Sequence, residues 1–225
     1  MLKPRVDDID WESVFSRATH GHLPPVKEAL AASVDEGIEL LARGLTFPGS
    51  DVLDIGCGNG RQLFGLLGQG LNRYVGIDPV RESVEFCARE LRSRVDGTEF
   101  VFLDVYNEMY NPTGLMLPES VVLPFADASF DGVIAGSVFT HFGTADVSRR
   151  YLAEMARVLR PDGKVFCSWF RSPPNELSTD RNRTVFREGE ILAMVTDQFR
   201  VYESRGGFMG EFHDQWCLYA QRRGH

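Results

Sequence analysis

The chain of 225 residues has only four cysteines, Cys57, Cys87, Cys167 and Cys217, and no two of them stand at a metal-binding or redox spacing. We therefore expect four reduced, mostly buried thiols and no metal site. No apolar run approaches the roughly 20 residues that span a bilayer. The first residues lack the apolar stretch of a secretory signal. These absences predict a cytoplasmic protein without a membrane partner.

Positive charge is also scarce. The sequence has 24 Lys and Arg residues against 32 Asp and Glu residues, which gives a net charge of −8. A basic surface for a phosphate backbone is therefore absent at the scale of the whole chain, so we do not expect nucleic acid as a partner. The short basic run at 92–95 is best explained as a solvated helix end. Length and composition fit one globular domain over residues 1–225, and they leave the oligomeric state open.

What is present is an alternation of strand-like and helix-like segments. Short apolar segments predict strands at residues 51–55, 73–78, 99–104, 130–137, 164–170, 199–204 and 215–222. Helical periodicity predicts helices at residues 26–44, 62–69, 80–95, 145–159 and 188–196. Such alternation predicts an α/β fold with a Rossmann-like, doubly wound sheet of seven strands, mostly parallel. Because no helix separates the last two strands, we expect the last strand to run antiparallel.

The helical periodicity also predicts which residues point inward, and the composition of residues 160–163 predicts a turn. The expected inward residues are Val26, Leu30, Val34, Ile38 and Leu41 in the first helix, Val84, Cys87, Ala88 and Leu91 in the third, and Val147, Tyr151, Met155, Val158 and Leu159 in the fourth.

The strongest local signal is the glycine-rich turn in VLDIGCGNG, residues 52–60, where Gly56, Gly58 and Gly60 lie between a strand and a helix. Glycines permit a sharp turn and the close approach of a ligand, and N–H groups at a helix start can receive an anionic group. A dinucleotide fingerprint would place its third glycine at position 61, which is Arg61. The turn therefore disfavours a nicotinamide cofactor, while a purely structural turn stays open.

Three acids accompany the predicted strands. Asp54 precedes the glycine turn, Asp78 ends the second strand and Asp104 ends the third. In doubly wound sheets, ligands bind beyond the carboxyl ends of the strands. Asp78 can accept hydrogen bonds from ribose hydroxyls, and Asp104 can accept one from an adenine amine. Each acid alone is weak evidence, because Asp is common after strands, but together they favour a nucleoside site.

The glycine turn is followed in order by GIDP (76–79), FLDV (102–105), LPFADASFDGVIAGSVFTHF (123–142) and YLAEMARVLRPDGKVFCSW (151–169). This pattern, over about residues 40–170, resembles the class I S-adenosylmethionine-dependent methyltransferases. The resemblance implies S-adenosylmethionine as the cofactor. Its implied binding residues are Asp54, Gly56, Cys57, Gly58, Gly60, Arg61, Asp78, Pro79, Asp104, Val105 and Ser137.

The resemblance also implies individual roles. The glycines lie under the methionine part of the cofactor, and Asp54 holds that loop and the cofactor's amino group. Asp78 binds the ribose diol. Asp104 meets the adenine amino group, with the backbone of Val105 beside the ring. Ser137 lies near the cofactor's amino group. Arg61 either faces the cofactor's carboxylate or is a solvent-exposed residue at a helix start.

Methyl transfer requires alignment of donor and acceptor, and it needs a base only when the acceptor is protonated and poorly acidic. His141, just beyond the fourth predicted strand, is the leading candidate base, with a packed histidine that shapes the pocket as the alternative. Tyr106 is a second candidate catalytic residue. It belongs to the 105–124 loop, which either closes over the site, binds a polar acceptor or stabilises the rim of the site. The other candidate residues of this loop are Asn107, Glu108, Tyr110 and Asn111.

Two further segments have open roles. The N-terminal arm, residues 1–25 with His20 and His22, is either a lid or an arm packed on the sheet. His213 and Asp214 either reach the acceptor pocket or simply open the last strand.

Motifs that the sequence lacks exclude several classes of methyl acceptor. The residues after the fourth strand read AGSVF, unlike the motif of amino-methylating DNA enzymes. The sequence has no Pro-Cys pair, no acidic cluster with cation spacing and no double-glutamate loop of the arginine methyltransferase type. We therefore expect metal-independent methylation of an oxygen or nitrogen of a small molecule, such as a sugar or a specialised metabolite. A protein or RNA methyltransferase and a non-catalytic S-adenosylmethionine-binding protein remain alternatives.

Overall fold

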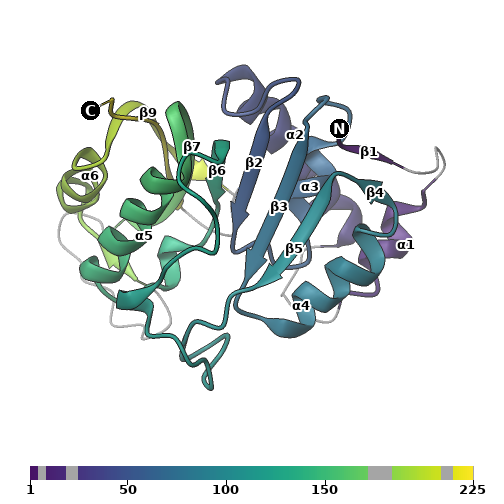
Figure 1. Ribbon diagram of the computed structural model, residues 1–225, viewed down its shortest axis with the longest axis horizontal. Helices are drawn as coiled ribbons and strands as arrows, with labels where there is room; N and C mark the ends of the chain where they lie inside the picture. Colours follow the sequence, from purple (N-terminus) through teal and green to yellow (C-terminus); the bar gives the residue numbers. More distant parts are fainter. Residues whose placement is uncertain (5–8, 19–24, 172–183, 209–214, 225) are drawn as a thin grey trace. The chain divides into compact units, whose positions relative to one another are not determined.

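The computed structural model describes residues 1–4, 9–18, 25–171, 184–208 and 215–224. The chain forms two compact units, Met1–Leu103 and Asp104–His225 (Figure 1). The prediction of one domain over residues 1–225 stays a prediction. His20, His22, His213 and Asp214 lie outside the described residues.

The first unit contains three parallel strands in the order β5–β3–β2. They are β2 (Asp51–Ile55), β3 (Arg73–Asp78) and β5 (Thr98–Phe102). The first two match the predicted strands, while the third ends two residues earlier than expected. The sequence gave no signal for the short antiparallel pair of β1 (Lys3–Pro4) and β4 (Val95–Asp96).

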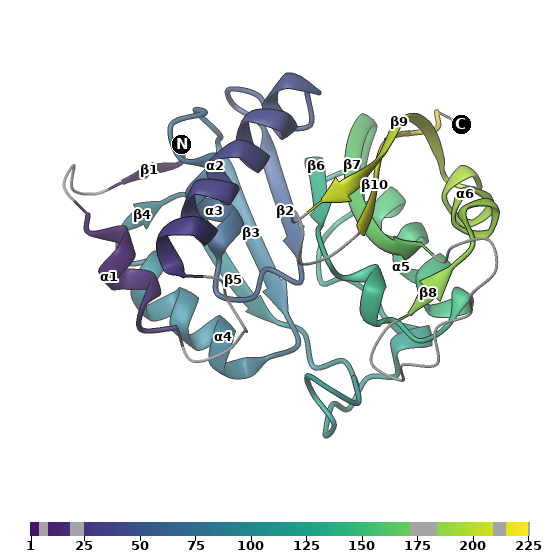
Figure 2. The ribbon, with the colours of Figure 1, turned by 180° about the vertical axis from the view of Figure 1, so that it is seen from behind.

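The helices of the first unit are α1 (Trp11–Phe15), α2 (Val26–Ala42), α3 (Arg61–Leu66) and α4 (Arg81–Phe86). Figure 2 shows α2 and α3 in front of β2 and β3. The rings of Trp11 and Phe15 in α1 contact the ring of Phe64 in α3, so this part of the N-terminal arm packs on the first unit. A lid role for the arm stays a prediction.

Helix α4 continues into a π-helical turn, Cys87–Leu91. A π turn inserts an extra residue and rotates the residues that follow. Val84, Cys87 and Leu91 are buried as expected, whereas Ala88 is exposed, so the expectation for Ala88 was wrong.

The predicted inward face of α2 was also largely wrong. Leu30 is buried, but Val34, Ile38 and Leu41 are exposed. The reason is a close contact of α2 with α3 through small residues. A Cβ atom on Gly37 would stand 1.9 Å from the carbonyl oxygen of Gly65, and no larger residue fits there. The hydrophobic pattern therefore mispredicted the inward face of α2, because the close approach of the α2 and α3 backbones determines which residues of α2 point inward.

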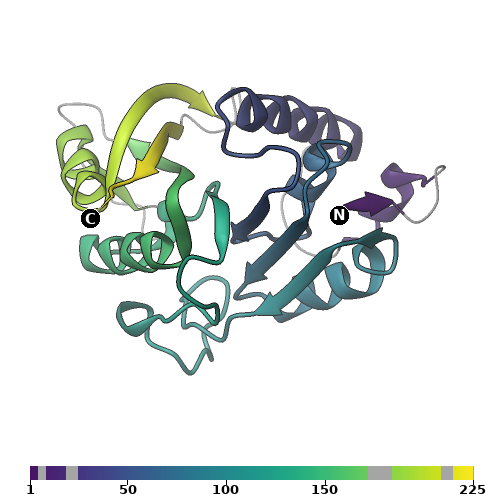
Figure 3. The ribbon, with the colours of Figure 1, turned by 45° about the horizontal axis from the view of Figure 1, so that its top comes forward.

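In the described part of the second unit, the strands follow the order β6–β7–β10–β9, with a short fifth strand beside β7. They are β6 (Phe130–Ala135), β7 (Leu159–Arg171), β9 (Phe199–Phe208) and β10 (Gln215–Arg222), and the short β8 (Val185–Phe186) pairs with β7. Strands β6 and β7 are parallel, and β10 runs antiparallel to both β7 and β9. Figure 3 shows the long β9 curving beside β10. The antiparallel last strand is thus confirmed.

The predicted turn at residues 160–163 does not separate α5 (Ala145–Val158) from the next strand, because β7 already begins at Leu159. The register between β6 and β7 shifts after Phe130, and Asp162 has a φ of +63°. The four residues therefore form an irregularity within β7, so the expectation of a separate turn was wrong.

The helices of the second unit follow the sequence pattern closely. Helix α6 (Glu188–Thr196) has the predicted bounds, and all five residues expected to point inward from the α5 region are buried. Thr144 caps α5, because its hydroxyl accepts a hydrogen bond from the N–H of Val147 at 3.3 Å. All four cysteines of the chain are buried thiols, as expected. Within the described ranges, no helix has both the length and the apolar character needed to cross a bilayer.

Candidate cofactor-binding and catalytic residues

The glycine loop after β2 has the backbone shape that its sequence predicts. Gly56, Gly58 and Gly60 have φ values of +70°, +51° and +77°. Residues other than glycine rarely adopt this backbone conformation. A Cβ atom on Gly60 would stand 2.3 Å from Leu91 Cδ1, whereas one on Gly58 would meet nothing within 4 Å. Gly60 therefore packs inside the first unit, and Gly58 borders open space that a ligand can approach.

Cys57, between these glycines, points inward. It is buried, and a Cβ atom on Gly76 of β3 would stand 2.8 Å from its sulfur. A hydrogen bond with Cys87, followed in importance by burial, raises the pKa of the Cys57 thiol well above its usual range. Only the backbone of Cys57 is therefore suited to its predicted place in the cofactor site.

The carboxylate of Asp78 is fixed to the glycine loop. Its Oδ2 accepts a hydrogen bond from the N–H of Gly58 at 2.7 Å, and its Oδ1 accepts one from the N–H of Val80 at 2.8 Å. The buried side chain thereby joins the loop to the start of α4, with the partly buried Pro79 between them. A carboxylate offers about four acceptor positions, so this geometry is compatible with the predicted ribose role.

Asp54 is buried beside Tyr74 on the neighbouring strand. The Tyr74 hydroxyl donates a hydrogen bond of 2.5 Å to Asp54 Oδ2. Burial raises the pKa of Asp54 to about 7, and the hydrogen bond from Tyr74 and the charge of Arg61 only partly oppose it. Burial also raises the pKa of Tyr74. Sequence reasoning missed Tyr74, and contact of Asp54 with the cofactor's amino group stays a prediction.

Arg61, the first residue of α3, binds α2. One of its guanidinium nitrogens donates to Ser33 Oγ at 2.8 Å, and another lies 3.2 Å from Glu36 Oε2. Burial raises the pKa of Glu36, although the charge and hydrogen bond of Arg61 act in the opposite direction. The Arg61 side chain is 21% exposed, and the alternative of a solvent-exposed residue at a helix start stays a prediction. Its contact with a cofactor carboxylate stays a prediction.

In the second unit, Asp104 and Val105 are held by a residue of the following loop. The side-chain amide of Asn111 donates to Asp104 Oδ1 and to the Val105 carbonyl, both at 3.1 Å. Val105 is buried and Asp104 is partly buried. Asn111 therefore orients the acid that the resemblance assigns to the adenine.

His141 lies at the end of a short 3₁₀ helix, Phe139–His141. Its Nε2 lies 3.3 Å from the hydroxyl of Tyr110, and the two rings meet edge to face with centroids 5.1 Å apart. The Asn107 amide donates to the His141 carbonyl at 3.2 Å. These contacts fix His141 against the loop. Tyr106, the other predicted catalytic residue, is 41% exposed on the same loop.

Ser137 adopts a φ of +59°, which is uncommon for a residue other than glycine and often marks a functional position. Its N–H donates to Ser168 Oγ at 2.7 Å, and its hydroxyl lies 3.0 Å from Gln215 Nε2. Ser168 in turn donates to Gln215 Oε1 at 2.5 Å. Sequence reasoning missed both partners, although a serine within the apolar segment KVFCSWF was an available signal.

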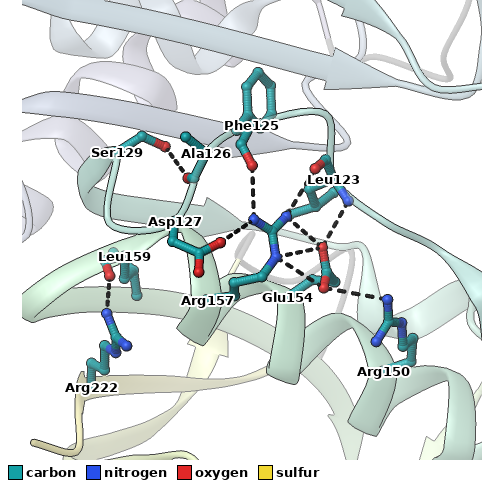
Figure 4. Close-up of polar contacts among 10 residues, drawn as sticks. All are labelled: Leu123, Phe125, Ala126, Asp127, Ser129, Arg150, Glu154, Arg157, Leu159 and Arg222. Carbon is teal, nitrogen blue, oxygen red and sulfur yellow. Dashed lines mark hydrogen bonds and ion pairs between the residues drawn. The ribbon is translucent and has the colours of Figure 1, made fainter.

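An ion cluster around the buried Glu154 holds the segment that leads into β6 (Figure 4). Glu154 of α5 accepts hydrogen bonds from the N–H of Leu123 and from Arg157, and Arg150 lies 3.3 Å away. Arg157 also donates to the carbonyls of Leu123 and Phe125. Burial opposes the charge on Glu154, but these hydrogen bonds and the arginine charges outweigh it and lower the pKa of Glu154. The cluster gives a structural reason for two of the family-like motifs, residues 123–142 and 151–169, because its hydrogen bonds join one motif to the other.

Comparison with known proteins identifies the family. A model of the methyltransferase domain family matches residues 53–167, which is more than half of the chain. The chain therefore belongs to this family, and the predicted class of S-adenosylmethionine-dependent methyltransferase domains is confirmed, with S-adenosylmethionine as its cosubstrate. In the parts of the chain that the structure describes, no group of three or more His, Cys, Asp or Glu residues is arranged to hold a metal ion.

The relatives differ in the activities that their names give. Phthiotriol/phenolphthiotriol dimycocerosates methyltransferase of Mycobacterium tuberculosis is 32% identical over 163 residues, which cover 68% of this chain and 52% of that protein. The chain thus spans about half the length of this relative. A Mus musculus protein named probable tRNA methyltransferase 9B is 36% identical over 121 residues, covering 52% of this chain and 21% of that protein.

Among solved structures, magnesium protoporphyrin IX methyltransferase from Synechocystis superposes with a TM-score of 0.65 at 17% identity, covering 95% of this chain and 93% of that one. This likeness shows the fold alone. It confirms the predicted Rossmann-like α/β architecture, with a mostly parallel sheet and antiparallel strands at its C-terminal end.

Proposed function

We propose that this chain transfers a methyl group from S-adenosylmethionine to an oxygen or nitrogen atom of a small molecule, without a metal ion. The observation that carries the proposal is the hydrogen bond of 2.7 Å between Gly58 and Asp78 in a chain of the methyltransferase domain family. It holds a ribose-binding type of carboxylate against a backbone loop that borders open space.

The described residues fit the cosubstrate. In the first unit, Gly58 provides an approachable backbone and Asp78 provides an oriented acceptor for ribose hydroxyls. In the second unit, the side-chain amide of Asn111 holds the carboxylate of Asp104, which we propose accepts a hydrogen bond from the adenine amine. When bound, S-adenosylmethionine supplies a methyl group on a positively charged sulfur. The protein's own contribution is then chiefly binding and alignment.

A proton must leave the acceptor when that acceptor is a hydroxyl group. We assign this task to His141, whose imidazole is oriented by Tyr110 and whose backbone is held by Asn107. An imidazole suits the task because its usual pKa lies near neutral pH. Tyr106, exposed on the same loop, is proposed to contact the acceptor.

The names of the relatives support two classes of methyl acceptor, a small molecule and RNA. The mycobacterial relative is named for phthiotriol and phenolphthiotriol dimycocerosates, which supports a small molecule with an oxygen acceptor. The mouse relative is named for tRNA, which supports RNA. The net charge of −8 disfavours binding of a polyanion, so we place the small molecule first.

The proposal is tested by incubating the protein with tritium-labelled S-adenosylmethionine and a cell lysate, then separating small molecules, RNA and protein. We expect label in the small-molecule fraction, and much less of it with Asp78→Asn. Label in the RNA or protein fraction would contradict the acceptor class. Absence of label from every fraction, although the protein binds the cosubstrate, would favour a non-catalytic binding protein.

A further inference from the structure

Residues 105–122, which form most of the segment between β5 and β6 and which we call the connector, expose an unusual amount of apolar surface. Among the described residues, six of the twelve exposed large apolar side chains belong to it; they are Tyr106, Met109, Tyr110, Leu115, Leu117 and Val122. Leu115 is 88% exposed and Leu117 is 63% exposed. Scattered exposed apolar residues are ordinary, but such a concentration within one loop marks a binding surface.

Three of these exposed side chains flank one backbone bridge of the connector. Val105 and Met116 form a parallel bridge, in which Tyr106 N donates to the Met116 carbonyl at 2.8 Å and Met116 N donates to the Asp104 carbonyl at 2.9 Å. Side chains alternate between faces along extended backbone. Tyr106 and Leu117 therefore lie opposite the buried Val105, and Leu115, at the bend just before Met116, is the most exposed of the three. We call these three residues the connector face.

Close backbone contacts and hydrogen bonds fix the conformation of the connector. A Cβ atom on Gly114 would stand 2.5 Å from the backbone of residues 105 and 106, so this close approach requires glycine. Asn107 accepts hydrogen bonds from the N–H groups of Met109 and Tyr110, both at 3.0 Å. Arg150 donates to the Val121 carbonyl at 2.6 Å. Fixed backbone with outward apolar side chains presents a surface at little ordering cost on binding.

The charge of the connector limits the kind of ligand that it can bind. The connector contains two acids, Glu108 and Glu119, and no Lys, Arg or His, and it is preceded by a third acid, Asp104. The connector's own charges therefore disfavour an anionic lipid surface or a phosphate group, whereas they do not disfavour an uncharged apolar group. The connector also touches the candidate base, because the Tyr110 hydroxyl lies 3.3 Å from His141 Nε2. An apolar ligand on the connector is thus continuous with the residue that would deprotonate an acceptor.

We propose that the connector face binds an uncharged, apolar portion of the methyl acceptor, so that the acceptor is a lipophilic molecule rather than a free sugar. This inference rests on the proposed function, since it names the acceptor class of that reaction. It assigns the contact of Tyr106 to the acceptor's apolar part, and it adds Leu115 and Leu117 as binding residues.

The test compares Leu115→Ser/Leu117→Ser with a matched variant, Ile38→Ser/Leu41→Ser. Ile38 and Leu41 are likewise exposed apolar residues, but they lie on α2 of the other unit. Binding of the neutral fluorescent probe N-phenyl-1-naphthylamine is titrated first. We expect the connector variant to bind at least about tenfold more weakly than the unmodified protein, and the α2 variant to bind within about twofold of it. Equal weakening in both variants, or none in the connector variant, overturns the proposal.

The second arm repeats the tritium-transfer reaction and extracts the products into hexane. Hexane-extractable label that the connector variant loses, with affinity for S-adenosylmethionine unchanged, supports the proposal. Label that stays in water overturns it. The proposed function fails separately, by the absence of transfer to any fraction. Co-sedimentation with neutral phosphatidylcholine vesicles that depends on Leu115 and Leu117 would replace the acceptor with a lipid surface as the ligand.

Discussion

At the residue scale, Asp78 is the side chain on which the cofactor assignment depends most. Its two oxygens receive the N–H groups of Gly58 and Val80, so the glycine loop and the start of α4 both fix its orientation. A buried carboxylate with this support is preorganised for hydroxyl donors. Asp54 differs, because its side chain is buried against Tyr74 and its pKa is raised to about 7.

Asp78→Asn keeps the size of the side chain but removes its charge and one acceptor oxygen. We expect the dissociation constant for S-adenosylmethionine to rise about 10- to 100-fold, the scale for an unmet buried polar partner. Calorimetric titration measures this change. Asp146→Asn, at a side chain that is 84% exposed, is the matched control and should leave binding unchanged. Unchanged affinity in a folded Asp78→Asn protein would refute the ribose assignment.

His141 and Tyr110 make a second prediction at this scale. His141→Gln should lower turnover by about 10²- to 10⁴-fold, the usual worth of a general base, while affinity for S-adenosylmethionine stays nearly constant. Tyr110→Phe keeps the edge-to-face ring contact but removes the hydroxyl that faces His141 Nε2. It should lower turnover less and shift its pH profile. Near-normal turnover of His141→Gln with the labelled acceptor would show that His141 only shapes the pocket.

At the scale of elements, the ion cluster on α5 explains how the segment before β6 is held. Glu154 is nearly inaccessible, and its partners Arg157 and Arg150 are one turn away along the helix on either side. Removing one partner of a buried ion pair leaves the other charge uncompensated. The cluster therefore attaches residues 123–127, which precede β6, to the C-terminal half of α5.

Glu154→Gln should reduce the free energy of unfolding by about 1–3 kcal/mol at pH 7, because Glu154 is buried while its arginine partners are partly exposed and Arg157 keeps its carbonyl acceptors. The pKa of Glu154 is lowered from its usual 4.5, so its stabilisation is present above that pH and is lost as the pH falls through the lowered pKa. Urea denaturation should therefore show a gap between variant and unmodified protein that closes in acid. Asp146→Asn breaks the exposed pair with Arg149 and should cost less than about 1 kcal/mol. A gap that persists unchanged at pH 3 would contradict this account.

The contact between α2 and α3 gives a second prediction for elements. A Cβ atom on Gly65 would stand 1.8 Å from the Ser33 carbonyl oxygen, so Gly37→Ala and Gly65→Ala should each destabilise the protein by about 1–3 kcal/mol. Gly189 in α6 has nothing within 4 Å of the same position, and Gly189→Ala should stabilise by about 0.4–1 kcal/mol. Thermal denaturation separates the three, and a stabilised Gly37→Ala would contradict the close contact.

These elements show what the sequence can predict. In α5 the inward residues are large and apolar, so hydrophobic periodicity identified them correctly. In α2 it failed, because two glycines on different helices brought the small-residue face inward. The connector at residues 105–122 has no periodicity, so its bridge and its Asn107 and Asn111 contacts were not predictable.

The same distinction holds for the candidate site. The glycine loop and Asp78 follow from local motifs, because each stands at the end of a strand that the sequence predicts well. The pairs of Asp54 with Tyr74 and of Ser137 with Gln215 depend on strand register between segments 20 and 78 residues apart. Single-sequence reasoning does not give that register.

At the scale of the whole molecule, the family is defined while the acceptor is proposed. The methyltransferase domain matches residues 53–167, and the chain spans about half the length of its mycobacterial relative. A fold shared at 17% identity does not determine an acceptor. The connector face and the net charge of −8 are the molecular features that favour a neutral, lipophilic acceptor over RNA.

The central claim is that the chain binds S-adenosylmethionine, and calorimetric titration tests it most directly. The protein is titrated with S-adenosylmethionine, with S-adenosylhomocysteine and, as a control, with NADH. The account predicts micromolar binding of the first two and none of the third, since Arg61 stands where a dinucleotide fingerprint requires glycine. Binding of NADH alone, or of none of the three, would contradict it.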